Sequence, residues 1–294
     1  LLLLILVRGM GTFWPVPVTL FELADGTVQL GEVTRRDKFR PRIEAVESMP
    51  PEARQTAEAL LEQQDGWSTR WLVRTGNFDF TGMHFSWVED FALASRFSPQ
   101  WAVVLERLTW GRFYGEPVGF FVDGEQIAFA ASTAWREFKR YHPVVKKVRD
   151  ERKRVERREI GDVNHRLERA RIALREAELV LADARATNSV AKIESAQTKL
   201  KEERDWAATV EDHANSEYES IRERIDTLKE SSGRYQLLMR LSDGAEVKVT
   251  LSQIVRGYPA NQLGVLQKAG IYLSRWKEFI TKDPREANSE GGVF

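Results

Sequence analysis

The chain has 294 residues, of which 42% are hydrophobic and 30% charged, and this composition excludes a disordered protein. Lysine and arginine total 44, as do aspartate and glutamate, so the net charge is zero and the electrostatic footprint of a nucleic-acid-binding protein is missing. Because there is no cysteine, disulfides, thiolate nucleophiles and thiolate metal sites are excluded as well.

The first segment, residues 1–14, opens with the apolar run LLLLILV and continues through Arg8 and Gly9 to the aromatic pair Phe13-Trp14. A cation and a tryptophan directly after an apolar run are typical of a transmembrane helix where it reaches the lipid headgroups. We therefore interpret residues 1–14 as the end of a transmembrane helix. On the pattern alone, a buried strand of a globular core remains the alternative.

Residues 15–140 are predicted to form the first part of a strand-rich globular body. Asp-Gly pairs at 25–26 and 123–124 lie between alternating runs, which indicates two tight β-hairpins. Ser48 is the expected N-cap and Pro51 the first residue of the helix PEARQTAEALLEQQ. Further strands are expected in aromatic and β-branched stretches, namely RWLVRTGNFDF, MHFSWVEDFAL, WAVVLERLTWGRFYG and VGFFVDGEQIAFA.

Residues 141–232 are predicted to form a long antiparallel coiled-coil hairpin. Apolar residues alternate at spacings of three and four in the first arm, at Ile160, Val163, Leu167, Ala170, Leu174, Ala177, Leu181 and Ala184. The return arm has compatible residues at Ile193, Ala196, Leu200, Ala207, Val210, Ala214, Ile221 and Leu228. Glu203, Glu217 and Arg224 also fall on its seam, so this arm is less regular. Arms of about 40 residues would extend roughly 60 Å.

The stretch ATNSV (186–190) is the expected turn between the two arms. A short turn makes the helices antiparallel neighbours. A long, rigid projection presents its tip to partners, so Thr187, Asn188 and Ser189 are the candidate interaction residues.

Residues 233–268 return to a strand pattern, with a third Asp-Gly hairpin at 243–244. The predicted fold class is thus α+β, a strand-rich body with β-hairpins interrupted by the helical hairpin. Residues 269–294 are expected to form an amphipathic helix, AGIYLSRWKEFI, followed by a lead-in to a second transmembrane helix. The apolar residues of this helix are Ile271, Leu273, Trp276, Phe279 and Ile280.

No recognised catalytic motif occurs in the sequence. The phosphate-binding loop, the nucleophile elbow and the dinucleotide fingerprint are missing, and the four histidines lack the spacing of metal ligands. We therefore predict no catalytic residue, cofactor or metal site, and a protein that is not an enzyme. Two functions stay open, a membrane-tethered module that contacts other proteins and a periplasmic adaptor of the membrane-fusion type.

The two ends of the chain resemble one family. LLLLILVRGMGTFWP is similar to the exit of the first transmembrane helix of the phosphate ABC transporter permease PstA family. DPREANSEGGVF resembles the segment that leads into the second transmembrane helix of that family. The matching positions are Arg8 and Gly9 at one end and Glu290, Gly291 and Gly292 at the other. The whole chain resembles an extracytoplasmic insertion between these two helices.

This resemblance implies a subunit of an importer for inorganic phosphate in the bacterial inner membrane, with the present segment periplasmic. The implied partners are a PstC-type partner permease, ABC ATPase subunits bound through regions outside this chain, and a periplasmic phosphate-binding protein, without nucleic acid. The family's transport path lies in membrane helices, so no residue here is assigned to phosphate. The helix at 269–280 is expected to lie near the bilayer.

Overall fold

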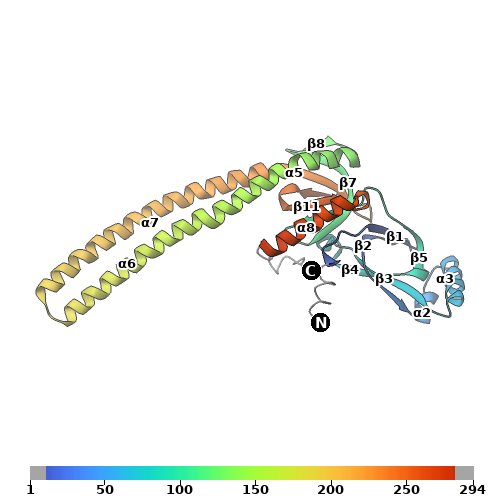
Figure 1. Ribbon diagram of the computed structural model, residues 1–294, viewed down its shortest axis with the longest axis horizontal. Coiled ribbons are helices and arrows are strands. Elements are labelled where there is room, and N and C mark those ends of the chain that lie inside the picture. Colours follow the sequence, from blue (N-terminus) through green and yellow to red (C-terminus); the bar gives the residue numbers. More distant parts are fainter. Residues whose placement is uncertain (1–10, 282–294) are drawn as a thin grey trace. The chain divides into compact units, whose positions relative to one another are not determined.

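The computed structural model describes residues 11–281 (Figure 1). Its fold is α+β, as the sequence predicts, with two antiparallel sheets and a long helical segment. The chain divides into two compact units, a strand-rich unit that ends at His142 and resumes at Arg234, and a helical unit, Pro143–Gly233. None of the helices within residues 11–281 is long and apolar enough to cross a membrane.

The first sheet has five antiparallel strands in the order β4-β3-β2-β1-β5. Its strands are β1 (Val18–Leu23), β2 (Val28–Phe39), β3 (Ser68–Arg74), β4 (Phe85–Glu89) and β5 (Leu93–Phe97). Helices α2 (Ile43–Glu47) and α3 (Pro51–Gln63) connect β2 to β3, and the short helix α4 (Phe78–Thr81) connects β3 to β4. A 3-10 turn, η1 (Asp90–Ala92), precedes β5.

The second sheet has the order β10-β9-β7-β6-β11, and β8 pairs with β7 outside this path. Its strands are β6 (Val103–Arg107), β7 (Arg112–Val122), β8 (Glu125–Ala128), β9 (Tyr235–Arg240), β10 (Glu246–Thr250) and β11 (Ile254–Pro259). A 3-10 turn, η3 (Leu251–Gln253), precedes β11, and another, η4 (Ala260–Gln262), follows it. The three Asp-Gly hairpins are confirmed, and Gly26, Gly124 and Gly244 have φ angles of 84°, 84° and 87°.

The two sheets repeat one topology. In each, four strands follow one another across the sheet and a 3-10 turn leads to a last strand that pairs with the first. The pairing register repeats as well, because Leu20 faces Leu30 and Phe97 just as Val104 faces Tyr114 and Tyr258. The strand-rich unit is therefore built from two equivalent five-stranded modules.

Irregularities in the strands recur at equivalent positions. The register of the last strand shifts next to the pair Glu22–Ser95 in the first sheet and next to Glu106–Arg256 in the second. The pairing register also shifts between β2 and β3, next to the pair Glu32–Arg74. It shifts at the equivalent place between β7 and β9, next to the pair Glu116–Arg240. The helical unit is inserted between β8 and β9, in the connection that corresponds to α2 and α3.

The main core lies between the two sheets, which bury equivalent faces against each other. It contains Val18 and Leu30 from the first sheet with Ala102, Val104, Tyr114, Tyr258 and Ala260 from the second sheet and its flanking segments. A separate cluster covers the other face of the first sheet, with Phe21, Trp71, Val73 and Val88. Alternate residues of the same strands thus belong to different clusters, as the period of two requires.

The helical unit is an antiparallel hairpin of α6 (Ile160–Ala186) and α7 (Val190–Gly233), which lie side by side along their length (Figure 1). Before α6 come α5 (Ala131–Arg154) and a π-helical turn, η2 (Val155–Glu159). The predicted seam of the first arm is confirmed by the burial of Val163, Ala170, Ala177, Leu181 and Ala184. Ala196, Ala214 and Ile221 are its buried counterparts on α7.

Two of the polar seam residues have partners on the opposite segment. Arg166 forms an ion pair with Glu217, and Arg224 donates to Glu151 at 2.8 Å and to Glu159 at 2.9 Å. Exposed ion pairs of this kind contribute little free energy but help to fix the register of two helices.

Three local predictions are wrong. Ser48 does not cap α3; it ends α2, where its hydroxyl donates to the carbonyl of Ala45 at 3.0 Å, and Pro50 is the N-cap residue. The stretch RWLVRTGNFDF is not one strand, because Asn77 takes a left-handed conformation (φ 54°) and α4 follows. MHFSWVEDFAL is likewise divided between β4, η1 and the start of β5.

Candidate functional site

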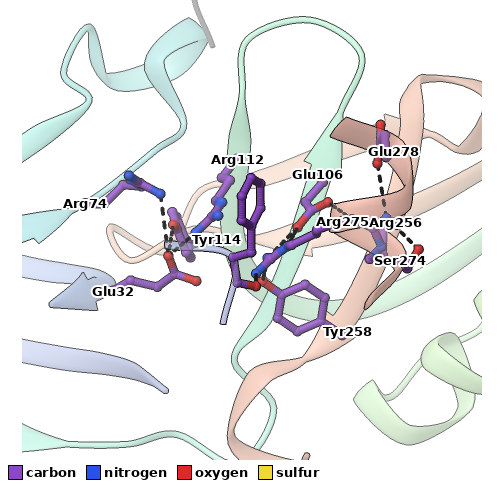
Figure 2. A network of polar contacts seen from close by, with 11 residues as sticks. Glu32, Arg74, Glu106, Arg112, Tyr114, Arg256, Tyr258, Ser274, Arg275 and Glu278 are labelled. Atoms are coloured by element: carbon purple, nitrogen blue, oxygen red, sulfur yellow. Dashed lines mark hydrogen bonds and ion pairs between the residues drawn. The ribbon is translucent and has the colours of Figure 1, made fainter. Parts of the chain in front are cut away.

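The helix α8 (Val265–Thr281) is the amphipathic helix that the sequence predicts, and it is fastened to the second sheet by a buried polar network (Figure 2). Glu106 on β6 is 6% exposed. Arg275 of α8 donates to its Oε1 from Nε at 2.8 Å and from Nη2 at 2.5 Å. Arg256 on β11 contacts the other carboxylate oxygen of Glu106 and also donates to Ser274 and Glu278 of α8.

Arg275 also holds the N-terminal segment of the described chain. Its Nη1 donates to the carbonyl oxygen of Phe13 at 2.7 Å, and its Nη2 donates to the Tyr258 hydroxyl at 2.6 Å. The Phe13 ring lies 5.1 Å from the Trp276 ring and 5.6 Å from the Phe279 ring, measured between centroids. One buried guanidinium therefore joins β6, β11, α8 and the segment that precedes β1.

A second buried carboxylate, Glu32 on β2, lies where the two sheets meet (Figure 2). It forms an ion pair with Arg112 of the second sheet and lies 3.9 Å from Arg74 of its own sheet. The Tyr114 hydroxyl donates to Glu32 Oε2 at 3.0 Å. Glu32 thus ties the first sheet to β7 of the second.

The pKa values of Glu106 and of the two buried tyrosines in this network are shifted by their surroundings. Burial acts to raise the pKa of Glu106, but the nearby guanidinium groups of Arg275, Arg256 and Arg112 outweigh it and hold the pKa below its usual range. Burial raises the pKa values of Tyr114 and Tyr258, and the negative charge of Glu32 adds to the effect, so both phenols stay protonated.

Such an arrangement holds segments together and is not suited to proton transfer. Glu106 is ionised and its oxygens accept hydrogen bonds from arginine, which leaves it a poor general base. Breaking a buried ion pair by removing one partner typically costs about 3–5 kcal/mol, because the other charge stays buried. Among residues 11–281, no group of three or more histidine, aspartate or glutamate side chains is placed to hold a metal ion.

A pocket of about 340 Å³ lies elsewhere, near the ends of β2 and α3. Its lining is Lys38, Gln64, Asp65, Trp67, Ser68 and Thr69. The network around Glu106 and Glu32 contributes no residue to it, so pocket and network are separate features.

The outward face of α8 is apolar. Leu266, Leu273 and Ile280 follow one another at intervals of seven residues and are 89%, 65% and 72% exposed. The one buried residue of the helix is Arg275. The apolar residues that the sequence assigns to this helix therefore do not all serve to pack it onto the body.

The predicted interaction residues Thr187, Asn188 and Ser189 form the turn between α6 and α7. Thr187 donates from its hydroxyl to Ala184 at 3.0 Å, Asn188 has a left-handed φ of 49°, and the Ser189 carbonyl accepts from Ile193 at 3.0 Å. These contacts shape the turn itself. The family-motif residues Arg8, Gly9, Glu290, Gly291 and Gly292 lie outside the described residues.

Sequence reasoning missed the network, although two signals point to it. Glu106 and Arg107 interrupt the apolar run of β6, and Arg275 lies within the apolar pattern of α8. A charge inside an apolar element often has a buried partner of opposite sign.

Comparisons of the chain with family models, with curated proteins and with solved structures found no match.

Proposed function

We propose that this chain is an extracytoplasmic interaction module held at the surface of a bacterial inner membrane. The observation that carries the proposal is the hydrogen bond from Arg275 to Phe13. It joins the segment that comes after the apolar run 1–7 to the helix that precedes residues 282–294. Two segments that enter one membrane face would leave the module on the same side, and a contact between Phe13 and α8 supports such an arrangement.

The surface of α8 supports a position next to the bilayer. Its outward apolar arc includes Leu266, Leu273, Ile280 and Phe279, and the exposed Lys277 lies at the border of this arc. Amphipathic helices with this pattern lie in the membrane interface, with the apolar face toward the acyl chains and lysines at the headgroups. Phe13 and Trp14 pack on the same helix and would extend the apolar surface.

The membrane protein that we propose is the permease subunit of an ABC importer for inorganic phosphate. The support for this is the resemblance of RGM and EGGVF, in order, to the family's first two membrane helices. The helical hairpin would then contact a periplasmic component, either the phosphate-binding protein or the PstC-type partner permease. ATPase subunits would bind through regions outside this chain.

A membrane-fusion-type periplasmic adaptor is the second candidate. The insertion of a helical hairpin between β8 and β9 of a strand-rich unit favours it. The two candidates differ in the residues that the gene encodes after Phe294. A permease continues with further hydrophobic helices, whereas an adaptor continues with a soluble tail.

The proposal is tested by photo-crosslinking in intact cells. A photo-reactive residue replaces Asn188 at the hairpin turn, and the matched control carries it at the exposed Glu230. We expect the Asn188 variant, but not the control, to capture the phosphate-binding protein or a transporter subunit. Capture of cell-wall material or of an unrelated envelope protein, or no capture, would contradict the proposed docking role.

A further inference from the structure

Arg70 on β3 is held between two aromatic rings on the exposed part of the first sheet. Its guanidinium carbon lies 4.2 Å from the centre of the Trp87 ring and 5.0 Å from that of Phe39. Its Nε is buried and has no hydrogen-bond partner. The Arg70 side chain as a whole is 34% exposed.

Arg74 repeats this arrangement on the same strand and the same face, about 13 Å along the strand. Its guanidinium carbon lies 5.3 Å from the ring of Phe85 on β4. The nearest carboxylate oxygens are 3.9 Å away for both arginines, on Asp37 for Arg70 and on Glu32 for Arg74. That separation is beyond hydrogen-bond range, which leaves both guanidiniums able to donate to a further acid.

The neighbouring strand β4 is an edge of the sheet. Within residues 11–281, β3 is its only pairing partner. Its side chains Phe85 and Trp87 are exposed. An edge strand with exposed aromatic residues is a ready template for a further strand.

The equivalent surface of the second sheet is different. The register places Gln236 where Arg70 lies, Lys248 where Trp87 lies and Glu246 where Phe85 lies. Arg74 has a counterpart in Arg240, but the shared fold does not require Arg70 or the two aromatic rings, which occur in the first sheet and not at the equivalent positions of the second.

We propose that the exposed face of β3 and β4 binds an extended, carboxylate-bearing segment of another protein. The segment pairs with the free edge of β4 and places acidic side chains near Arg70 and Arg74. A planar guanidinium held by stacking matches the two oxygens of a carboxylate, and strand pairing supplies main-chain hydrogen bonds. Asp37 and Glu89 on the same face disfavour a continuous anionic surface such as a membrane.

The test uses an eight-residue peptide of alternating glutamate and threonine, with the glutamine–threonine peptide as its counterpart. Binding to the full chain is measured by titration calorimetry. We expect the acidic peptide to bind at least tenfold more tightly than its counterpart. Arg70→Gln should weaken binding by about tenfold or more, since the variant loses a charge-assisted hydrogen bond to the peptide carboxylate. Arg70→Lys should also weaken binding, because lysine keeps the charge but loses the planar fork.

The matched control is Arg36→Gln, which removes an exposed arginine from the same sheet. Arg36 lies opposite Trp71 in the register of β2 and β3, so its side chain is on the other face of the sheet from Arg70. This variant should bind as the unchanged protein does. Equal losses in Arg36→Gln and Arg70→Gln, or no binding of the acidic peptide at millimolar concentration, would overturn the proposal. So would Arg70-dependent binding to vesicles of anionic lipid in place of the peptide. Should Arg70→Gln fail to fold, Arg70→Lys and Trp87→Leu provide the same comparison.

Discussion

Arg275 and Glu106 form a buried ion pair between α8 and β6 of the second sheet, with two hydrogen bonds to one carboxylate oxygen. Glu22 occupies the equivalent position in the first sheet, where it accepts a hydrogen bond from Ser95 at 2.6 Å. The second sheet has Arg256 in place of Ser95. In the second sheet, Arg256 and Glu106 both contact α8, whereas Ser95 and Glu22 of the first sheet contact each other. The second module therefore differs from the first at the position where it binds a helix.

We predict that Arg275→Gln lowers the free energy of unfolding by about 3–5 kcal/mol, because Glu106 stays buried with one of its partners removed. Urea unfolding followed by circular dichroism measures this change. Arg136→Gln, which removes an exposed arginine paired with Glu137, is the control and should change stability by less than about 1 kcal/mol. Similar losses in the two variants would show that the buried network has no special role.

Stability should also depend on pH through Glu106. Its folded-state pKa is lower than its unfolded value, so its contribution is present above about pH 4.3 and is lost as the pH falls through the folded pKa. Unfolding free energies between pH 7 and pH 3 test this for the unchanged chain and for Glu106→Gln. The unchanged chain should lose more stability on acidification than the variant. Parallel curves would contradict the assignment.

Two equivalent glycines should respond alike to substitution. A Cβ at Gly31 would clash with the carbonyl oxygen of Arg74, and one at Gly115 would lie 2.7 Å from that of Arg240. Gly31→Ala and Gly115→Ala should therefore both destabilise the protein, by about 1–3 kcal/mol each. Gly161→Ala in α6 has open space around it and should stabilise the helix by up to about 1 kcal/mol. Thermal unfolding distinguishes the two signs.

A charged substitution in the buried seam between α6 and α7 should also destabilise the protein. Ala177 is buried between α6 and α7, and Ala177→Asp would place a charge there without a partner. We expect a loss of several kcal/mol and a lower helical signal at 222 nm. Glu176→Asp, at the exposed neighbouring position, should change neither by much. If Ala177→Asp has the stability and the helical signal of the unchanged protein, Ala177 does not lie in a buried seam.

The sequence predicts local features well. The Asp-Gly hairpins depend on two residues, and the hairpin seam depends on a spacing that repeats along one helix, so both can be recognised without the tertiary fold. Cross-strand partners are set by register over long separations, and Glu106 with Arg275 is such a pair. The repeat of the two modules is hidden for the same reason, because Glu22, Gly31 and Glu32 match Glu106, Gly115 and Glu116 amid otherwise different residues. Ser48 shows that a local signal can also mislead. Serine is a favourable N-cap residue, but Ser48 lies at the C-terminal end of the preceding helix α2.

The proposed position of α8 on a membrane can be measured directly, because the chain has no native cysteine. A polarity-sensitive fluorophore is attached to Leu273→Cys on the apolar arc, and to Gln267→Cys on the polar side as the control. With phosphatidylethanolamine–phosphatidylglycerol vesicles, the label at position 273 should shift to shorter wavelength and be quenched by lipid-borne nitroxide, while the label at 267 stays in water. If both labels remain in water, or both enter the lipid equally, α8 does not lie on the bilayer as proposed.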